Sequence, residues 1–233
     1  MSEARDQIIQ SIRRALKRGA LTTETEKALA ERLAHPARNL IPARAASLDH
    51  RGQVDLFIAM AEEVQTTVTR VADAAAVPDA VADYLSQHNL PSHLVMTPDP
   101  RLDDIPWSER PLLELRRGRA EDADQVGVTA CFAGIAETGT LMLTSGPESP
   151  TRNNFLPDTH IVVMRGAQVV ASYEDGWARL RTERAAGGQS PMPRTVNFIT
   201  GPSRTGDIEQ RIELGAHGPR RLHIVLIDDE AVA

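Results

Sequence analysis

The chain contains 233 residues, 41% of them hydrophobic, which is enough for a substantial core in one large domain or in a domain with a small appendage. Its formal net charge of −6 and the lack of a clustered basic stretch exclude the surface that nucleic-acid binding usually requires. One cysteine, Cys131, excludes an internal disulfide and any all-cysteine iron–sulfur or zinc site built by this chain alone.

The N-terminal part predicts two helices and a linker. Apolar residues recur at helical spacing over residues 4–17, and a second helix starts after a capping threonine, Thr22 or Thr23, and ends at Pro36. The stretch PARNLIPARAASLDHRG follows, with two prolines and no clear period, as is typical of a linker. We therefore assign residues 1–48 to a helical extension with its linker and residues 49–233 to an α/β domain.

Helical and strand patterns alternate in the next part of the chain. The predicted helices are 54–64 and 78–85, and the predicted strands are 68–72, 93–96 and 112–115. Residues 98–110, rich in proline and acidic residues, predict a surface loop. Alternation of this kind is typical of crossover units on a largely parallel sheet.

The middle of the chain predicts adjacent strands without long helices between them, which indicates antiparallel additions to the sheet. These strands are 126–132, 138–144, 161–164 and 169–171. Glu137 and Thr138 lie between two of them, where a carboxylate amid small and apolar residues is partly buried and needs a partner. Glu137 could act as a general base, a substrate acceptor or a nucleophile, or it could only accept turn N–H groups.

The stretch 195–220 carries the clearest functional pattern. Alternating apolar residues from Val196 predict a strand, Gly201 breaks it, and Ser203, Thr205 and Asp207 suit the first turn of a helix. Such a strand–turn–helix unit presents free N–H groups at the carboxyl edge of a sheet, where anions bind. The same residues could do no more than cap a helix.

Two further residues favour a binding site in this stretch. Arg204 lies between the two capping hydroxyls, and its guanidinium can grip a phosphate or carboxylate with two parallel hydrogen bonds. His217 lies between two glycines, which leave its ring unshielded, although a histidine in this setting could be a simple turn residue. Residues 182–194, with two glycines and two prolines, predict a mobile loop that could be a lid or a plain connector.

Four blocks of sequence, GIAETGTL, RNNFLPDTHIVV, FITGPSRTGDIE and GAHGPR, resemble in this order the LUD (lactate-utilisation domain) family, in its LutC-type branch. The resemblance covers roughly residues 50–228. It implies a Rossmann-like parallel sheet with added antiparallel strands, similar to the ribose-phosphate isomerase, glucosamine-phosphate deaminase and CoA-transferase group. It also implies a part in oxidising L-lactate to pyruvate, beside partner subunits that carry the iron–sulfur clusters.

The resulting hypothesis is a LutC-type subunit, without redox chemistry of its own, that binds a small anion at the carboxyl edge of the sheet. The predicted catalytic residues are Glu137 and His217, and the predicted binding residues are Thr138, Ser203, Arg204, Thr205, Asp207 and Arg152. No metal site is predicted, and a homo-oligomer is compatible with the sequence. No apolar run approaches the ~20 residues of a membrane span and no signal-peptide segment is evident, so a cytoplasmic protein is expected.

Two other functions remain open. The chain could be a stand-alone enzyme of the isomerase or CoA-transferase kind, acting on a small phosphorylated or carboxylate substrate with Glu137 as base or nucleophile. It could instead be a non-catalytic assembly or regulatory module whose N-terminal helices dock a partner. Turnover by the purified chain would favour the first, and loss of assembly on deleting residues 1–35 would favour the second.

Overall fold

The computed structural model describes residues 2–37, 41–190, 192–208 and 211–228. The chain divides into two units, Met1–Leu40 and Ile41–Ala233. The first unit contains the helices α1 (Ser2–Ala15) and α2 (Thr23–Ala34), and the Thr22 side chain caps α2 by accepting a hydrogen bond from the Thr25 backbone N–H. The predicted N-terminal helices are therefore confirmed, and α2 buries none of its residues.

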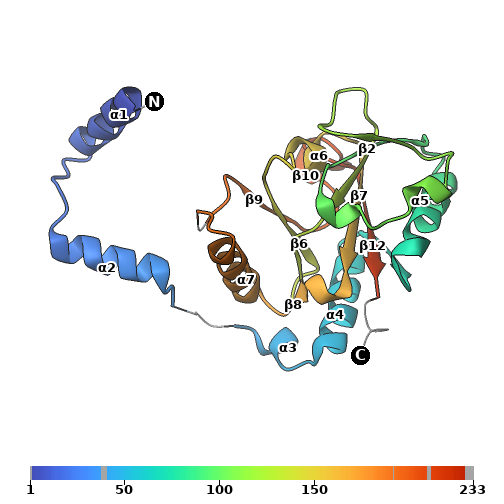
Figure 1. Ribbon diagram of the computed structural model, residues 1–233, viewed down its shortest axis with the longest axis horizontal. Coiled ribbons are helices and arrows are strands. Elements are labelled where there is room, and N and C mark those ends of the chain that lie inside the picture. The colour runs from blue at the N-terminus through green and yellow to red at the C-terminus, as the bar shows by residue number, and fades with distance from the viewer. Residues whose placement is uncertain (1, 38–40, 191, 209–210, 229–233) are drawn as a thin grey trace. The chain divides into compact units, whose positions relative to one another are not determined.

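The second unit contains the remaining helices and all the strands (Figure 1). Its helices are α3 (Ala43–Ala46), α4 (His50–Glu63), α5 (Val77–Gln87), α6 (Arg152–Phe155) and α7 (Tyr173–Ala186). Its strands are β1 (Thr67–Val71), β2 (His93–Met96), β3 (Glu114–Arg117), β4 (Val126–Ala130), β5 (Ala133–Ile135), β6 (Thr140–Thr144), β7 (Thr159–Arg165), β8 (Val169–Val170), β9 (Val196–Ile199), β10 (Arg204–Ile208), β11 (Arg211–Leu214) and β12 (Arg221–Ile227). Among the described residues, no helix is long and apolar enough to cross a membrane.

Six strands form a parallel sheet in the order β1-β12-β7-β4-β2-β3, which confirms the predicted parallel sheet. Its central strands are covered on both faces, so they read as nearly continuous apolar runs. The strand β12, with the sequence RLHIVLI, is buried from Leu222 to Ile227. The β7 strand beside it is buried from Thr159 to Met164.

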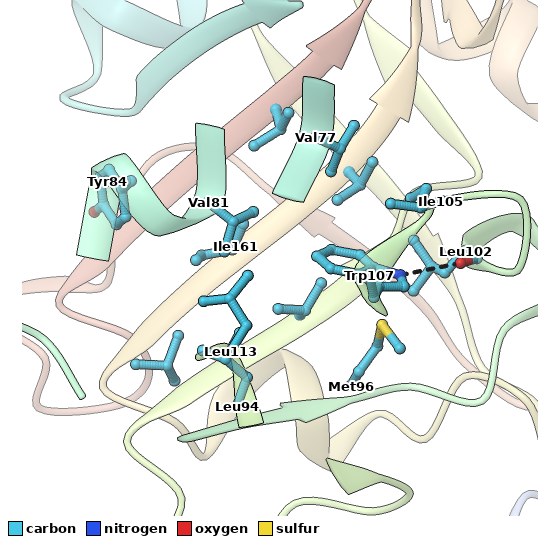
Figure 2. Packing of buried hydrophobic residues seen from close by; sticks show 14 of the residues in the cluster. Val77, Val81, Tyr84, Leu94, Met96, Leu102, Ile105, Trp107, Leu113 and Ile161 are labelled. Carbon is cyan, nitrogen blue, oxygen red and sulfur yellow. Dashed lines mark hydrogen bonds between the residues drawn. The ribbon is translucent and has the colours of Figure 1, made fainter. Parts of the chain in front are cut away.

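One face of the parallel sheet packs against α5 and the segment from β2 to β3 (Figure 2). Helix α5 presents Val77, Val81 and Leu85, which recur at helical spacing and are all buried. Trp107 fills the space beside them, and its indole N–H donates to the Leu102 carbonyl oxygen at 3.2 Å. This face of the sheet is therefore covered by a hydrophobic core in which the Trp107 indole N–H has a hydrogen-bond acceptor.

The other face packs against α4 and a second sheet. Asp49 caps α4 by accepting from the Gly52 backbone N–H, and the helix buries Val54, Phe57 and Ala61 along one side. The second sheet has the order β8-β5-β6-β9, with β5–β6 and β6–β9 antiparallel. The predicted antiparallel additions are confirmed in part, because this second sheet is separate and mixed, with β5 and β8 parallel, and the predicted strands 126–132 and 161–164 belong to the parallel sheet as β4 and β7. Leu180 of α7 packs on the outer side of the second sheet.

The predicted helix after Ser203 is wrong. The chain instead forms a two-stranded hairpin, in which Arg204 pairs with Leu214 and Thr205 pairs with Glu213. The capping residues pointed to a helix start, but Gly206 weakens a helix by roughly 1 kcal/mol. Thr205 and Ile208 on β10 and Ile212 on β11 are β-branched and favour extended backbone. The capping residues therefore predicted the start of a helix, but the residues that follow them favour a strand.

The predicted loop 182–194 is also partly wrong, because α7 continues to Ala186. Residues 183–186, ERAA, are all good helix formers, and the helix ends where Gly187 and Gly188 begin. The connector between α7 and β9 is therefore shorter than predicted.

Candidate functional site

A cavity of about 380 Å³ lies between the exit of β9 and the entry of β12. Its walls come from residues 198–204, from residues 217–219, and from four residues at or near the starts of β7 and β12, namely Asn154, Phe155, His160 and Leu222. Three predicted site residues, Ser203, Arg204 and His217, line this cavity. The structure thus brings together the two loops whose closeness the sequence pattern suggested.

The cavity lies at the amino end of the parallel strands, so the predicted position at the carboxyl edge is wrong. His160 and Leu222 are the second residues of β7 and β12, and they face each other in the parallel register. The prediction failed because β9 does not belong to the parallel sheet. It pairs antiparallel with β6 in the second sheet, so its exit reaches the opposite end of β12.

Backbone hydrogen bonds hold the two loops together. The Ser203 N–H donates to the Pro219 carbonyl oxygen at 2.8 Å, and the Gly215 N–H donates to the Ser203 carbonyl oxygen at 2.9 Å. The Ser203 hydroxyl accepts from the His217 backbone N–H at 3.4 Å. Gly201 has a φ of +77°, and a Cβ there would lie 2.5 Å from the Val64 carbonyl oxygen, so this turn requires glycine.

Arg204 is the charged side chain of the cavity. Arg204 is exposed, and among the residues that the structure describes its guanidinium has neither a hydrogen bond nor an ion pair. His217 is exposed as well. A free guanidinium at a cavity wall attracts an anion and can bind a carboxylate with two parallel hydrogen bonds.

Two residues that sequence reasoning did not select complete the cavity. His160 is fully buried, and its Nε2 lies 2.8 Å from the Thr129 hydroxyl. Burial lowers the pKa of His160 to about 3, so the ring is neutral at pH 7. The His160 Nδ1 and the Asn154 Oδ1 are buried atoms that find no hydrogen-bond partner in the described part of the chain.

Such atoms are uncommon in folded proteins, and each one calls for an explanation such as a bound water or ligand. The available signal was the block RNNFLPDTHIVV, where Asn154 and His160 interrupt or border apolar residues. A polar residue within a buried strand needs a partner. Only the fold shows that Asn154 and His160 line the same cavity as Arg204.

Glu137 is not among the residues that line this cavity. Its Oε1 accepts a hydrogen bond of 3.2 Å from the Tyr173 backbone N–H, the first residue of α7. Its own backbone N–H donates to the Ala171 carbonyl oxygen. Of the roles that the sequence left open, this contact corresponds to the acceptance of turn N–H groups.

We expect Glu137→Ala to lower the free energy of unfolding by about 1 kcal/mol, as is usual when a helix start loses its side-chain acceptor. Glu137→Gln keeps an acceptor oxygen and should cost less than half as much. Urea denaturation of both variants checks this, with ligand binding measured in parallel. A large loss of binding in a fully folded Glu137→Gln variant would contradict the capping role.

Thr138 belongs to a hydroxyl cluster that reaches the cavity indirectly. Its Oγ1 lies 2.7 Å from the Thr140 Oγ1 and 3.1 Å from the Tyr173 hydroxyl. The Thr140 Oγ1 lies 2.7 Å from the Thr200 Oγ1, and Thr200 lines the cavity. The cluster therefore ties the turn between β5 and β6 to the loop that carries Ser203 and Arg204.

The remaining predicted residues lie elsewhere. Thr205 and Asp207 belong to β10, so the predicted helix that Asp207 would cap does not exist, and the side chain of Asp207 lies outside the described atoms. Arg152, at the start of α6, forms an ion pair with Asp122 and lines a different cavity. Within the described ranges, no group of three or more histidine, cysteine, aspartate or glutamate residues could hold a metal ion.

Comparisons with known proteins give a consistent family. The family model of the LUD domain matches residues 54–227. Lactate utilization protein C from Geobacillus kaustophilus is 34% identical over 117 residues, a match that spans 49% of this chain and 48% of that protein. The uncharacterized protein YkgG from Escherichia coli is 28% identical over 206 residues, which cover 83% of this chain and 87% of the relative.

A solved structure supports the fold. The crystal structure of a DUF162 family protein from Deinococcus radiodurans matches with a TM-score of 0.57 at 24% identity, covering 77% of this chain and 99% of that one. The match to the Geobacillus relative, in contrast, spans only about half the length of that protein.

Proposed function

Because this chain belongs to the LUD domain family, we propose that it takes part in the oxidation of L-lactate to pyruvate as a subunit without redox chemistry of its own. Relatives named lactate utilization protein C support this role. The lone thiol supports the second half of it. Burial raises the pKa of Cys131 to about 12, and its Sγ donates to the Ala133 carbonyl oxygen at 3.0 Å, so this thiol is unsuited to ligate a cluster. The iron–sulfur clusters would then belong to partner subunits.

The ligand of this subunit is a small 2-hydroxy or 2-oxo carboxylate, bound in the cavity of Arg204. Its carboxylate pairs with the free guanidinium. The hydroxyl of a 2-hydroxy acid donates to the Asn154 Oδ1, and the keto oxygen of a 2-oxo acid accepts from the neutral His160 Nδ1–H. The observation that carries this proposal is the lining of one cavity by three residues: Arg204, which pairs with no acid among the described residues, and Asn154 and His160, which each hold a buried polar atom without a partner in the same part of the chain.

Each group of the cavity has a separate part in this binding. The Ser203 hydroxyl accepts from the His217 N–H, which holds the loop, and its own O–H is left to donate to the ligand. Because the His160 ring is neutral, it adds no second positive charge, and the one guanidinium matches one carboxylate. The Gly201 turn and the paired loops fix the backbone before the ligand arrives, which limits the ordering cost of binding.

We expect Arg204→Gln to weaken the binding of L-lactate or pyruvate at least tenfold, since it removes a charge-assisted contact of about 1.5–3 kcal/mol. Arg117→Gln is the matched control, because Arg117 is also exposed but pairs with Asp103 outside the cavity. Isothermal titration of each ligand into the three proteins gives the affinities. Equal affinity in the two variants would contradict this assignment of Arg204.

The preference for a hydroxyl provides an internal test in the same titrations. Propionate has the shape of lactate without its hydroxyl, so the native protein should prefer lactate and an Asn154→Leu variant should lose most of that preference. The assembly is tested by purifying the chain from lactate-grown cells and assaying lactate oxidation with and without the proteins that accompany it. A chain that never associates with a cluster-bearing protein would contradict the subunit role, even if lactate binds.

A further inference from the structure

A second and larger cavity, of about 1250 Å³, lies beyond the carboxyl ends of β2 and β4. Residues 98–101 leave β2 into its wall, and Phe132 follows β4. The loop of residues 144–152 after β6 and the connector between α7 and β9 form other parts of the wall. Open α/β sheets bind their ligands at this edge of the strands. This cavity is distinct from that of Arg204, which adjoins the amino ends of β7 and β12.

Five arginines line the larger cavity, and three of them are held by the protein. Arg101 forms two hydrogen bonds with Asp99 and a third with the Cys131 carbonyl oxygen. Arg152 pairs with Asp122. The Arg184 Nε donates to the Ser190 carbonyl oxygen at 2.6 Å, which fastens the connector after α7. These three guanidiniums shape the walls and are not available to a ligand in full.

The other two arginines of this cavity are Arg119 and Arg194. Arg119 and Arg194 are exposed, and in the described ranges neither guanidinium has a hydrogen bond or an ion pair. Arg119 follows β3 and Arg194 precedes β9, so they come from parts of the chain that are far apart in sequence. Two of the acids of the wall, Asp99 and Glu183, pair with Arg101 and Arg179. Two guanidiniums that line one cavity and form no ion pair within the described ranges match an anion with several oxygens, above all a phosphate.

The remaining walls restrict the class of ligand. Phe132 and several proline rings supply rigid apolar surface, because proline fixes the backbone of the segments that carry it. The exposed Glu148 carboxylate also lines the cavity and, in the part of the chain described, has no partner, so it can accept from an N–H or O–H donor of a ligand. Inorganic phosphate would satisfy the arginines alone. The volume exceeds that of many small-molecule sites, which are typically about 300–1000 Å³.

We propose that this cavity is a binding site for a nucleoside phosphate. The phosphate groups bind Arg119 and Arg194, the base packs on the apolar wall, and its amino or ribose donors serve Glu148. The site accounts for two sequence features that the lactate cavity does not use, Arg152 and the residues after α7. Two cavities at opposite ends of the parallel strands then serve two ligands, one a small carboxylate and the other a larger phosphorylated compound.

Isothermal titration of ADP, UDP, ribose 5-phosphate and inorganic phosphate into the full chain tests the proposal. We expect ADP or UDP to bind more tightly than inorganic phosphate, and Arg119→Gln and Arg194→Gln each to weaken that binding on the order of tenfold. Circular dichroism confirms that both variants are folded, which their exposed positions favour. Arg204→Gln should leave nucleotide affinity unchanged, and L-lactate should not compete.

Each alternative result overturns the proposal. Failure of both nucleotides to bind removes the site, and equal affinity in Arg119→Gln, Arg194→Gln and the native chain removes the assigned phosphate contacts. Inorganic phosphate that binds as tightly as ADP would show that the cavity does not recognise a nucleoside. Loss of lactate binding in Arg204→Gln tests the smaller cavity separately, so the failure of one assignment does not decide the other.

Discussion

Replacement of Gly139 with alanine is expected to destabilise the folded protein by about 3 kcal/mol or more, from overpacking and left-handed backbone together. Gly139 has a φ of +63°, and a Cβ there would lie 2.2 Å from the Ala61 backbone nitrogen and 2.5 Å from the Met60 carbonyl carbon. Both atoms belong to α4, whose Phe57 and Ala61 are fully buried, so the helix backbone has no room to retreat. Few single substitutions reach this size.

Gly188→Ala is the matched control for this substitution. Gly188 has the same φ of +63°, but nothing lies within 4 Å of its Cβ position, so it isolates the backbone cost of roughly 1 kcal/mol. Urea denaturation gives the free energy of unfolding of both variants. If the two losses are equal, contact with α4 is not the reason for glycine at position 139. A clear difference would show that the turn after Glu137 and Thr138 is shaped by packing.

Acidification is the second large expected effect. Burial lowers the pKa of His160 to about 3 and, together with the charge of His88, lowers the pKa of His223 to about 4. In the unfolded chain both rings titrate near 6.5. Below that pH the two histidines bind protons in the unfolded state but stay neutral in the folded state. The free energy of unfolding therefore falls as the pH falls, from 6.5 to about 4 for His223 and from 6.5 to about 3 for His160.

The combined loss should amount to several kcal/mol, because each pKa unit corresponds to about 1.4 kcal/mol. Urea denaturation at pH 7, 6, 5 and 4 measures it. His223→Gln should flatten the dependence of the unfolding free energy on pH, because the variant lacks one of the two histidines that bind a proton only in the unfolded state. An unchanged slope in that variant would contradict the assignment.

The sequence predicted individual helices and strands well where the apolar residues within one segment repeat at a regular spacing. The strand at 93–96 is observed with the predicted bounds, and α5 begins one residue before Pro78. These patterns depend on burial, which repeats every second residue in a strand and about every third or fourth in a helix. Sheet membership does not follow from them. Nothing within residues 196–199 indicates that β9 pairs with β6 rather than with the parallel strands.

The candidate site was predictable only in part for the same reason. Arg204 and His217 are close in sequence, so the sequence could predict that their two loops lie near each other, and both residues line the cavity. Asn154 and His160 come from α6 and β7, and only the register between β7 and β12 brings them to the same cavity. Glu137 was selected as a buried acid, but the position of α7 decides that it caps a helix. The implied likeness to the isomerase and CoA-transferase group, and the docking of the N-terminal helices, stay predictions.

The pairing of β1 with β12 has a consequence for the synthesis of the protein. Thr67 and His223 are register partners, and their side chains meet at 2.8 Å across 156 positions of the chain. At the edge of the sheet, β1 has β12 as its neighbour, so it lacks this partner until β12 has left the ribosome. Contacts of such long separation form slowly. The nascent chain therefore carries an unpaired edge strand while the residues between β1 and β12 are translated, a period in which chaperones protect such segments from aggregation.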